Sequence, residues 1–355
     1  PGNGIDDDAN GYIDDVNGWN AYTNSGTPSF SNHGTHVAGT IGAVGNNGIG
    51  VVGVNWNVKV MPISGSSSLE ATVIAAYSYV LDMRKMYNET AGDKGAYVVS
   101  TNASFGVDYG DPADYPLWCA MYDSLGLAGI LSAGATANLN VNIDVVNDVP
   151  TACGSNFLLS VTNTTSSDIK NPGAAYGATT IDLGAPGTGI LSTTSNGYGN
   201  LTGTSMATPH VAGAVGLMHS AVCVDILQAY AGNPGGLAIY IRTKLLSEGV
   251  DELQSLASIT VSGGRLNLFK AVKSVIDTCV SIAFEADPST CGNCDGSLTA
   301  TVIGGEAPYQ YAWSTNDTSN SISGLCAGTY TLTVVDALSD TLIGQGVVSD
   351  SSGPV

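Results

Sequence analysis

The sequence predicts an α/β domain with a mainly parallel sheet, followed by a small all-β sandwich of the immunoglobulin-like type. Between residues 33 and 276, short β-branched runs alternate with longer helical patterns. This alternation is typical of parallel strands joined by right-handed helical crossovers. After Cys279 the helical period stops, and short alternating strands indicate an antiparallel sandwich. We therefore expect one domain over residues 1–279 and a second over residues 280–355.

The expected elements follow in order along the chain. Residues 58–63 form an apolar run that predicts a buried strand, and residues 69–87 keep a 3.6-residue apolar period that predicts a helix. Small residues dominate 205–221, which indicates a helix lying close against the sheet. The other expected elements are a helix at 118–125 and strands at 97–101, 129–133, 158–162, 297–303, 309–313 and 329–335.

The charge balance excludes some classes of partner. Ten basic and thirty acidic residues give a formal net charge of −20. Such a chain repels phosphate backbones, so we expect no nucleic-acid partner. Glycine, asparagine and charged residues interrupt every apolar run before it reaches about 18 residues, so we expect no membrane insertion.

Seven dispersed cysteines favour disulfides over a metal site. Disulfides persist in oxidising surroundings, so we expect a protein that is secreted or displayed at the cell surface. The sequence leaves the connectivity open. The pairs we expect are Cys119–Cys153, Cys223–Cys279, and Cys326 with either Cys291 or Cys294.

Two segments carry the candidate reactive groups, His33 in Asn-His-Gly-Thr-His-Val-Ala-Gly-Thr and Ser205 in Gly-Thr-Ser-Met-Ala-Thr-Pro-His. A serine at a helix start lies in the positive field of that helix, and its backbone N–H can donate to a developing oxyanion. The hydroxyl still needs a base, and His33, at a glycine-bounded helix start, is the best placed of the four histidines. We expect His36 to make a structural contact and Pro209 to lie in the first helical turn, where a missing N–H costs little.

These two segments resemble the signatures of the subtilisin-like serine proteases, the subtilase family, in residue type, order and spacing. The resemblance covers roughly residues 1–276 and includes the turn at 185–187 and the strand at 102–106. It implies a subtilisin-like three-layer fold and a secreted serine endopeptidase that hydrolyses polypeptides through an acyl-enzyme. In that mechanism His33 is the general base and Ser205 the nucleophile.

The same resemblance implies further site residues. The family uses an asparagine side chain as an oxyanion donor, and here the resemblance points to Asn138, with Asn140 as the competing candidate. The residues implied to line the substrate's backbone and its S1 side are Ser104, Phe105 and Gly106.

The sequence departs from the family at the catalytic aspartate. In the family this residue ends an apolar strand upstream of the histidine, and no such strand precedes His33. We expect the aspartate to lie outside this chain, before Pro1, and the sheet to lack that strand. One alternative is that Asp14 or Asp15 substitutes. A functional alternative is a catalytically inert surface or adhesion protein on the same scaffold.

An acidic loop near the start of the chain predicts a structural Ca²⁺ site. Oxygen ligands stand at alternate positions with glycine at the sixth, as in the first half of an EF-hand loop. The twelfth position is Asn17, so a bidentate carboxylate is missing unless Asp15 serves; a solvated acidic turn is the alternative. The expected ligands are Asp6, Asp8, Asn10, the Tyr12 carbonyl and Asp14.

The second domain resembles the repeats of SprB-type bacterial surface adhesins. The similarity is carried by residues 294–297, 304–313 and 324–330. Tyr311 and Trp313 stand two residues apart and share one face of a strand. They are either part of the sandwich core or a platform for cell-surface or glycan contact.

Overall fold

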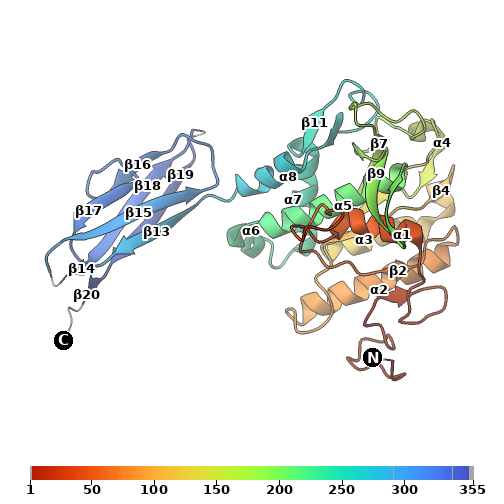
Figure 1. Ribbon diagram of the computed structural model, residues 1–355, viewed down its shortest axis with the longest axis horizontal. Helices are drawn as coiled ribbons and strands as arrows, with labels where there is room; N and C mark the ends of the chain where they lie inside the picture. Colours follow the sequence, from red (N-terminus) through yellow and green to blue (C-terminus); the bar gives the residue numbers. More distant parts are fainter. Residues whose placement is uncertain (1, 291, 338, 352–355) are drawn as a thin grey trace. The chain divides into compact units, whose positions relative to one another are not determined.

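The computed structural model describes residues 2–290, 292–337 and 339–351 (Figure 1). The chain divides into two compact units. The first comprises Pro1–Ala221 and Leu227–Val272, and the second comprises Val222–Ile226 and Lys273–Val355.

A six-stranded sheet forms the centre of the first unit, in the order β11-β12-β8-β7-β5-β3. All neighbouring pairs are parallel except β11 with β12, which confirms the predicted mainly parallel sheet. The strands are β3 (Ser100–Ala103), β5 (Leu131–Ala135), β7 (Leu158–Thr164), β8 (Leu183–Pro186), β11 (Val250–Glu252) and β12 (Gly264–Leu266).

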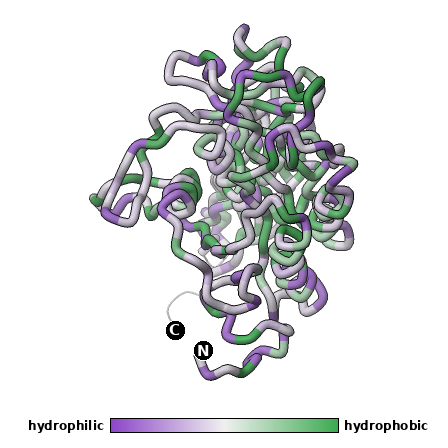
Figure 2. The backbone as a smooth tube through the Cα atoms, turned by 90° about the vertical axis from the view of Figure 1, so that its right-hand side faces the viewer, coloured by the Kyte–Doolittle hydropathy of each residue, from purple (hydrophilic) through white to green (hydrophobic). Residues whose placement is uncertain are grey.

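Helices pack on this sheet. Helix α5 (Thr204–Ala221) lies against β3, β5, β7 and β8, and α1 (Asn32–Gly42) packs on α5. Small side chains such as Ala207 and Ala214, both buried, let α5 approach the strands closely. Figure 2 shows hydrophilic segments mainly in peripheral loops and hydrophobic segments through the interior. The other helices are α2 (Glu70–Glu89), α3 (Pro116–Leu127), α4 (Ile143–Val146), α6 (Val224–Ala229), α7 (Pro234–Ser247), α8 (Leu268–Ile276) and the 3₁₀ turn η1 (Pro112–Asp114).

The predicted buried strand at residues 58–63 is wrong in extent and in burial. Only β2 (Ile63–Ser64) is a strand, and it pairs with β1 (Trp19–Asn20) outside the six-stranded sheet. Val60 is 41% exposed. In the described part of the chain β3 pairs with β5 alone, so residues 58–62 have no neighbouring strand that would bury them.

The strand predicted at 97–101 begins later, at Ser100. A tight turn in which the Val98 N–H donates to the Ala96 carbonyl at 2.8 Å precedes it. The Val98 carbonyl is taken by the buried guanidinium of Arg84. Because the Arg84 side chain and the turn already use the hydrogen-bonding groups of Ala96 and Val98, regular strand pairing starts only after these residues.

The second unit holds two antiparallel three-stranded sheets, ordered β13-β15-β17 and β16-β18-β19. Leu298, Leu332 and Val348 are buried in its core. The predicted all-β architecture is confirmed. Its strands are β13 (Ser281–Asp287), β14 (Ser289–Thr290), β15 (Gly296–Ile303), β16 (Gln310–Trp313), β17 (Ser321–Leu325), β18 (Gly328–Val335), β19 (Thr341–Val348) and β20 (Asp350–Ser351).

Trp313 belongs to the core of this unit. It is 4% exposed, and its indole N–H donates to the Ser319 carbonyl at 2.8 Å. Tyr311 is partly buried against the same cluster. The core interpretation of this pair is confirmed, and the pair offers no open aromatic platform.

Three disulfides match the expected pairing: Cys119–Cys153, Cys223–Cys279 and Cys294–Cys326. Cys291, the other candidate partner of Cys326, lies outside the described residues. Among the described residues, every helix is too short or too polar to cross a bilayer.

Candidate active site

Ser205 lies in the first turn of α5 and is locked to the segment that follows β3. Its hydroxyl donates to the Ser104 carbonyl at 3.3 Å, and its own carbonyl accepts from Ser104 Oγ at 2.9 Å. Pro209 lies inside the helix rather than at its first turn, which corrects the prediction for that residue. Because proline has no N–H, the Ser205 carbonyl four residues earlier has no helical donor, and Ser104 supplies one.

Glycine backbone brings the start of α5 against the end of β8. The Gly203 N–H donates to the Gly187 carbonyl at 2.9 Å. A Cβ on Gly187 would lie 2.6 Å from the Gly203 carbonyl oxygen and 2.6 Å from Asn163 Oδ1. Only glycine permits this approach. The turn at 185–187 therefore sets how closely the start of α5, which carries Ser205, lies to the end of β8.

The structure places Asn138, rather than Asn140, beside the nucleophile candidate. Asn138 Oδ1 accepts from the Thr204 N–H at 3.0 Å and from Thr204 Oγ1 at 3.3 Å. These bonds assign the oxygen of the amide, so its NH₂ group is left to donate. Asn140 is used elsewhere, because its Oδ1 accepts from Lys170 Nζ at 3.1 Å.

His33 is the second residue of α1, whose N-cap is Ser31 with Oγ accepting from the Gly34 N–H. The side chain is exposed. Within the described residues it forms no hydrogen bond, so the base candidate His33 and the nucleophile candidate Ser205 are not bonded to each other in this structure. Partial desolvation and the neighbouring His36 lower the pKa of His33, which keeps the imidazole neutral as a base requires.

His36 is structural, as expected. It is fully buried, and its Nε2 lies 2.9 Å from the Ile190 carbonyl and 3.1 Å from the Gly199 carbonyl. These carbonyls belong to β9 (Ile190–Thr194) and β10 (Gly197–Leu201), which form a hairpin. His36 therefore ties α1 to this hairpin.

Neither Asp14 nor Asp15 serves His33. Asp14 accepts from the backbone N–H groups of Gly2 and Gly4 at 2.6 and 2.9 Å. Asp15 accepts from the Tyr79 hydroxyl at 2.8 Å. In the described ranges no carboxylate pairs with the imidazole, so the substitution alternative has no structural support.

The three residues expected to line the substrate, Ser104, Phe105 and Gly106, make different contacts. Ser104 contacts Ser205 as described above. Phe105 stacks on Trp118 with ring centroids 5.7 Å apart and is partly buried in the core. A Cβ on Gly106 would lie 2.4 Å from the Val149 carbonyl oxygen. Phe105 thus anchors the segment in the core, Ser104 contacts Ser205, and Gly106 lies against Val149.

The carboxylates of the acidic loop make hydrogen bonds within the loop and to the residues before it. Asp6 accepts from the backbone N–H groups of Asn10 and Gly11 at 3.0 and 2.8 Å, which curls the loop. Burial and the charges of Asp15 and Asp6 raise the pKa of Asp8. Asp14 instead holds the backbone of residues 2–4. Among the described residues, no group of three or more His, Cys, Asp or Glu side chains is arranged to hold a metal.

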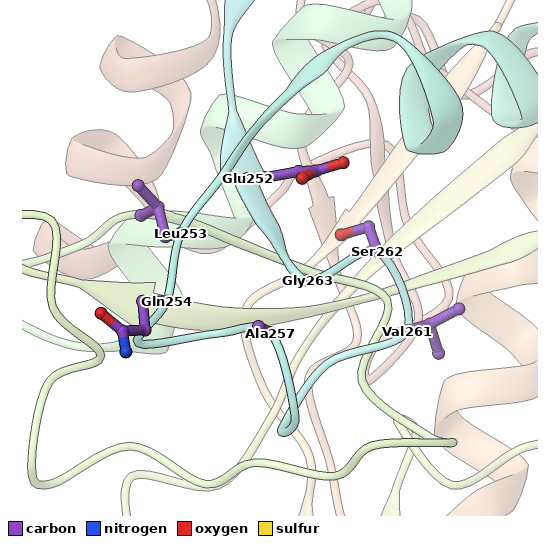
Figure 3. A pocket seen from close by; sticks show the side chains of 7 residues that line it. All are labelled: Glu252, Leu253, Gln254, Ala257, Val261, Ser262 and Gly263. Carbon is purple, nitrogen blue, oxygen red and sulfur yellow. The ribbon is translucent and has the colours of Figure 1, made fainter.

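A surface hollow lies elsewhere on the first unit (Figure 3). It is formed by the connection between β11 and β12, at the opposite end of the strand order from β3. Glu252 is its one ionisable side chain, so it offers no nucleophile and base pair. Its lining residues are Glu252, Leu253, Gln254, Ala257, Val261, Ser262 and Gly263.

Sequence comparison places these residues within a protease family. Residues 2–225 match the model of the subtilase family, and residues 283–318 match the SprB repeat. Subtilisin-like protease 1 of Plasmodium vivax is 31% identical over 291 residues, covering 78% of this chain and 43% of the relative. Thermitase of Thermoactinomyces vulgaris is 32% identical, covering 73% and 81%. An extracellular basic protease of Dichelobacter nodosus is 37% identical over 53% of the chain and 31% of the relative.

Comparison of structures gives the same fold. A protease of Pseudoalteromonas arctica aligns with a TM-score of 0.53 and 24% identity, covering 71% of this chain and 73% of the other. The epidermin leader peptide processing serine protease of Staphylococcus aureus aligns with a TM-score of 0.55 and 18% identity, covering 72% and 69%. The chain spans about two fifths of the length of the Plasmodium relatives that it matches.

Proposed function

Because the chain belongs to the subtilase family, we propose that it is a serine endopeptidase acting on polypeptides through an acyl-enzyme. One observation carries the proposal: Asn138 Oδ1 accepts hydrogen bonds from the N–H and the hydroxyl of Thr204, so its NH₂ group is left to donate next to the helix start that carries Ser205. We infer that the Ser205 hydroxyl is the nucleophile and that the Ser205 N–H and Asn138 Nδ2 are the two oxyanion donors.

The proposed mechanism uses three side chains. Ser205 Oγ attacks the peptide carbonyl while His33 accepts its proton. The oxyanion accepts hydrogen bonds from the Ser205 N–H and Asn138 Nδ2. His33 then protonates the leaving amine, and water activated by the same imidazole releases the acyl group. For the first step Ser205 Oγ must leave the Ser104 carbonyl, a bond of 3.3 Å that is long for a hydroxyl donor.

We propose that the aspartate that orients His33 comes from residues before Pro1. Two features support this: His33 has no carboxylate partner among the described residues, and β3 has one edge without a strand. A strand beside β3 would also provide the neighbour that residues 58–62 lack.

Proteolysis of an unfolded protein tests the proposed function. Protein carrying its complete upstream sequence is expected to release peptides from fluorescein-labelled casein, whereas residues 1–355 alone are expected to be nearly inactive, and a sulfonyl fluoride that acylates active serines is expected to stop the release. Casein left intact by protein carrying its complete upstream sequence would reject the proposal.

Replacing Asn138 by alanine is expected to lower kcat by about 10²–10³-fold, the effect of losing one oxyanion donor. KM for a peptide substrate should change little, because the bond strengthens only in the transition state. Steady-state kinetics measures both constants.

Asn140→Ala is the matched control, since Asn140 is bonded to Lys170 and lies outside the proposed oxyanion site. We expect its kcat to stay within about twofold of the parent. A larger loss in Asn140→Ala than in Asn138→Ala would reverse the assignment.

The unbonded His33 also supports a second function, an inert surface protein on the same scaffold. The two functions differ in the reactivity of Ser205. A fluorophosphonate modifies an activated serine and leaves an inert hydroxyl unmodified, so the absence of any adduct in the protein with its complete upstream sequence would favour the scaffold.

We propose that the protein acts outside the cell or on its surface. Three disulfides, relatives named as extracellular proteases and the SprB repeat support this location. A surface contact by the second unit remains part of the proposal, but it does not involve Trp313, which is buried.

We also propose that the acidic loop binds Ca²⁺ through Asp6, Asp8, Asn10 and the Tyr12 carbonyl, with Asp15 closer to this set than Asp14. Burial first, and then the charges of Asp15 and Asp6, raise the pKa of Asp8, and a bound cation would offset both effects. Added Ca²⁺ is expected to raise the free energy of unfolding by about 2.7 kcal/mol at one hundred times Kd. Titration calorimetry and thermal melts measure this.

Asp8→Asn should lose the calcium effect, whereas Asp7→Asn, which removes the same charge from a side chain bonded to Asn3, should keep it. The affinity should fall with acidification, because protonated Asp8 cannot bind the cation. If added Ca²⁺ gives neither heat of binding nor a shift in melting temperature, the calcium site is rejected and the loop is a solvated acidic turn.

A further inference from the structure

We propose that Lys170 is a positioning residue of the oxyanion site, because its ammonium group holds in place the segment that carries Asn138. The inference rests on the proposed peptidase function and deepens it. Lys170 lies in the connection between β7 and β8, and the proposed mechanism gives it no role. It acts on the reaction through Asn138 and does not itself touch the substrate.

The Lys170 ammonium is surrounded by neutral acceptors. Its Nζ donates to the Ala174 carbonyl at 2.6 Å and to the Asn171 carbonyl at 2.9 Å. The third acceptor is Asn140 Oδ1, at 3.1 Å. An ammonium has three N–H donors, so these three oxygens can use all of them. The ring centroid of Tyr176 lies 5.4 Å from Nζ and adds a cation–π contact.

Lys170 differs from the lysines of this chain that form ion pairs. Lys244, for example, is bonded to Glu248 at 2.8 Å on the same helix. Among the described residues no carboxylate pairs with Lys170, and the nearby Asp168 is paired with Arg265. Burial lowers the pKa of Lys170, so holding this cation without a carboxylate costs free energy. Charge-assisted bonds to neutral oxygens offset that cost and fix the oxygens in one arrangement.

The acceptors of Lys170 lie on both sides of Asn138. Asn140 follows Asn138 by two residues in the same segment. The residue after Ala174 donates its N–H to the carbonyl of Ala137, the residue before Asn138, at 3.0 Å. That donor, Ala175, is fully buried, and Ala137 is buried beside it in one hydrophobic cluster. Movement of residues 171–175 would therefore move Asn138.

The turn at residues 171–174 has few other bonds that could hold it. Pro172 has no N–H, and both Pro172 and Gly173 are exposed. Within the turn, the Gly173 N–H donates to Asn171 Oδ1 at 2.8 Å and the Ala174 N–H to the Asn171 carbonyl at 3.0 Å. The Lys170 ammonium joins the carbonyls of the first and last residues of this turn. Without it, both carbonyls lose a charged donor and the turn is free to shift.

Lys170→Met keeps the length of the side chain and removes the ammonium. In protein with its complete upstream sequence, we expect kcat for a peptide p-nitroanilide to fall by about 10–10²-fold, the effect of a small misplacement of a reacting group. KM should stay within about twofold, because Asn138 is proposed to bind the oxyanion only in the transition state. Lys170→Arg keeps the charge and N–H donors, so it should lose less activity than Lys170→Met.

The same substitution in the Asn138→Ala background separates positioning from a general structural effect. There Lys170→Met should lower kcat by less than about twofold, because the group that it positions is already absent. A Lys170 that only stabilises the fold would lower kcat by the same factor in both backgrounds, and that result would overturn the inference.

Lys244→Met is the matched control, since it removes an ammonium that is paired with Glu248 on α7. Its kcat should stay within about twofold of the parent. Asn140→Ala removes one of the three acceptors and leaves both carbonyl contacts, so its predicted twofold limit is unchanged. Circular dichroism checks that the variants are folded. If Lys170→Met does not fold, Lys170→Arg in the two Asn138 backgrounds makes the same comparison.

Hydrogen exchange of the Thr204 N–H tests the inference without turnover, because this N–H donates to Asn138 Oδ1 and its donor residue is buried. Exchange measured by NMR should be at least about tenfold faster in Lys170→Met and unchanged in Lys244→Met. Unchanged exchange in Lys170→Met would overturn the inference. If the parent hydrolyses no peptide but the exchange responds as expected, the peptidase function is rejected and Lys170 still positions Asn138.

Discussion

Ser205→Ala is expected to lower kcat on the order of 10⁶-fold, the size seen when the nucleophile of subtilisin is removed. Without the hydroxyl no acyl-enzyme forms, and the oxyanion donors retain only a residual acceleration. The helix start should persist, because the Ser205 carbonyl that bonds Ser104 belongs to the backbone. Hydrolysis of a peptide p-nitroanilide measures the loss.

Ser220→Ala is the control for this variant. Its hydroxyl bonds to the Leu217 carbonyl near the other end of the same helix. We expect its kcat to remain within about twofold of the parent. A loss below about tenfold in Ser205→Ala would show that another group is the nucleophile.

Protein that includes the residues before Pro1 is expected to hydrolyse peptides about 10⁴-fold faster than residues 1–355 alone, because a carboxylate then fixes the tautomer of His33. The pH profile should move as well. Activity needs neutral His33, whose pKa is lowered in the present structure by desolvation and by His36. The acid limb of residues 1–355 should lie below pH 6.5, and a neighbouring carboxylate should shift it upward.

The aspartate of the added segment provides the control for this comparison. Its replacement by asparagine should return both the rate and the acid limb to those of residues 1–355. Equal rates with and without the added segment would mean that no carboxylate from that region serves His33.

Helices and strands were predicted best from the sequence where apolar or small residues recur at a regular spacing along the chain. The small-residue pattern of α5 holds because that helix is buried on nearly every side, and the 3.6-residue period of α2 holds because that helix buries one face on its neighbours. The run at 58–63 has the same apolar character but is no buried strand, because a strand needs a partner and its pairing depends on distant residues.

In the candidate site, too, some features follow from the local sequence and others depend on contacts with residues far along the chain. The helix-start position of Ser205 follows from its own segment. The choice between Asn138 and Asn140 required the contacts to Thr204 and Lys170, which sequence spacing does not reveal. The sequence does indicate that the Ser205 carbonyl lacks a helical donor, because a proline follows four residues later. It does not indicate that Ser104 donates to that carbonyl instead.

Asp148 had no signal in the sequence. It stands among other acidic and polar residues of an irregular segment, and it is buried in β6 (Asp148–Val149), which pairs with β4 (Val107–Asp108). Burial first, and then the charge of Asp108 opposite it, raise its pKa to about 7. A single buried acid is thus a tertiary feature, found only when the neighbours on every side are known.

Fluorophosphonate labelling followed by peptide mass mapping tests most directly whether Ser205 and His33 act together as nucleophile and base. In the protein with its upstream residues, we expect one adduct, on Ser205, and loss of labelling in His33→Ala. An adduct on another residue, or labelling of Ser205 at an unchanged rate in His33→Ala, would contradict it.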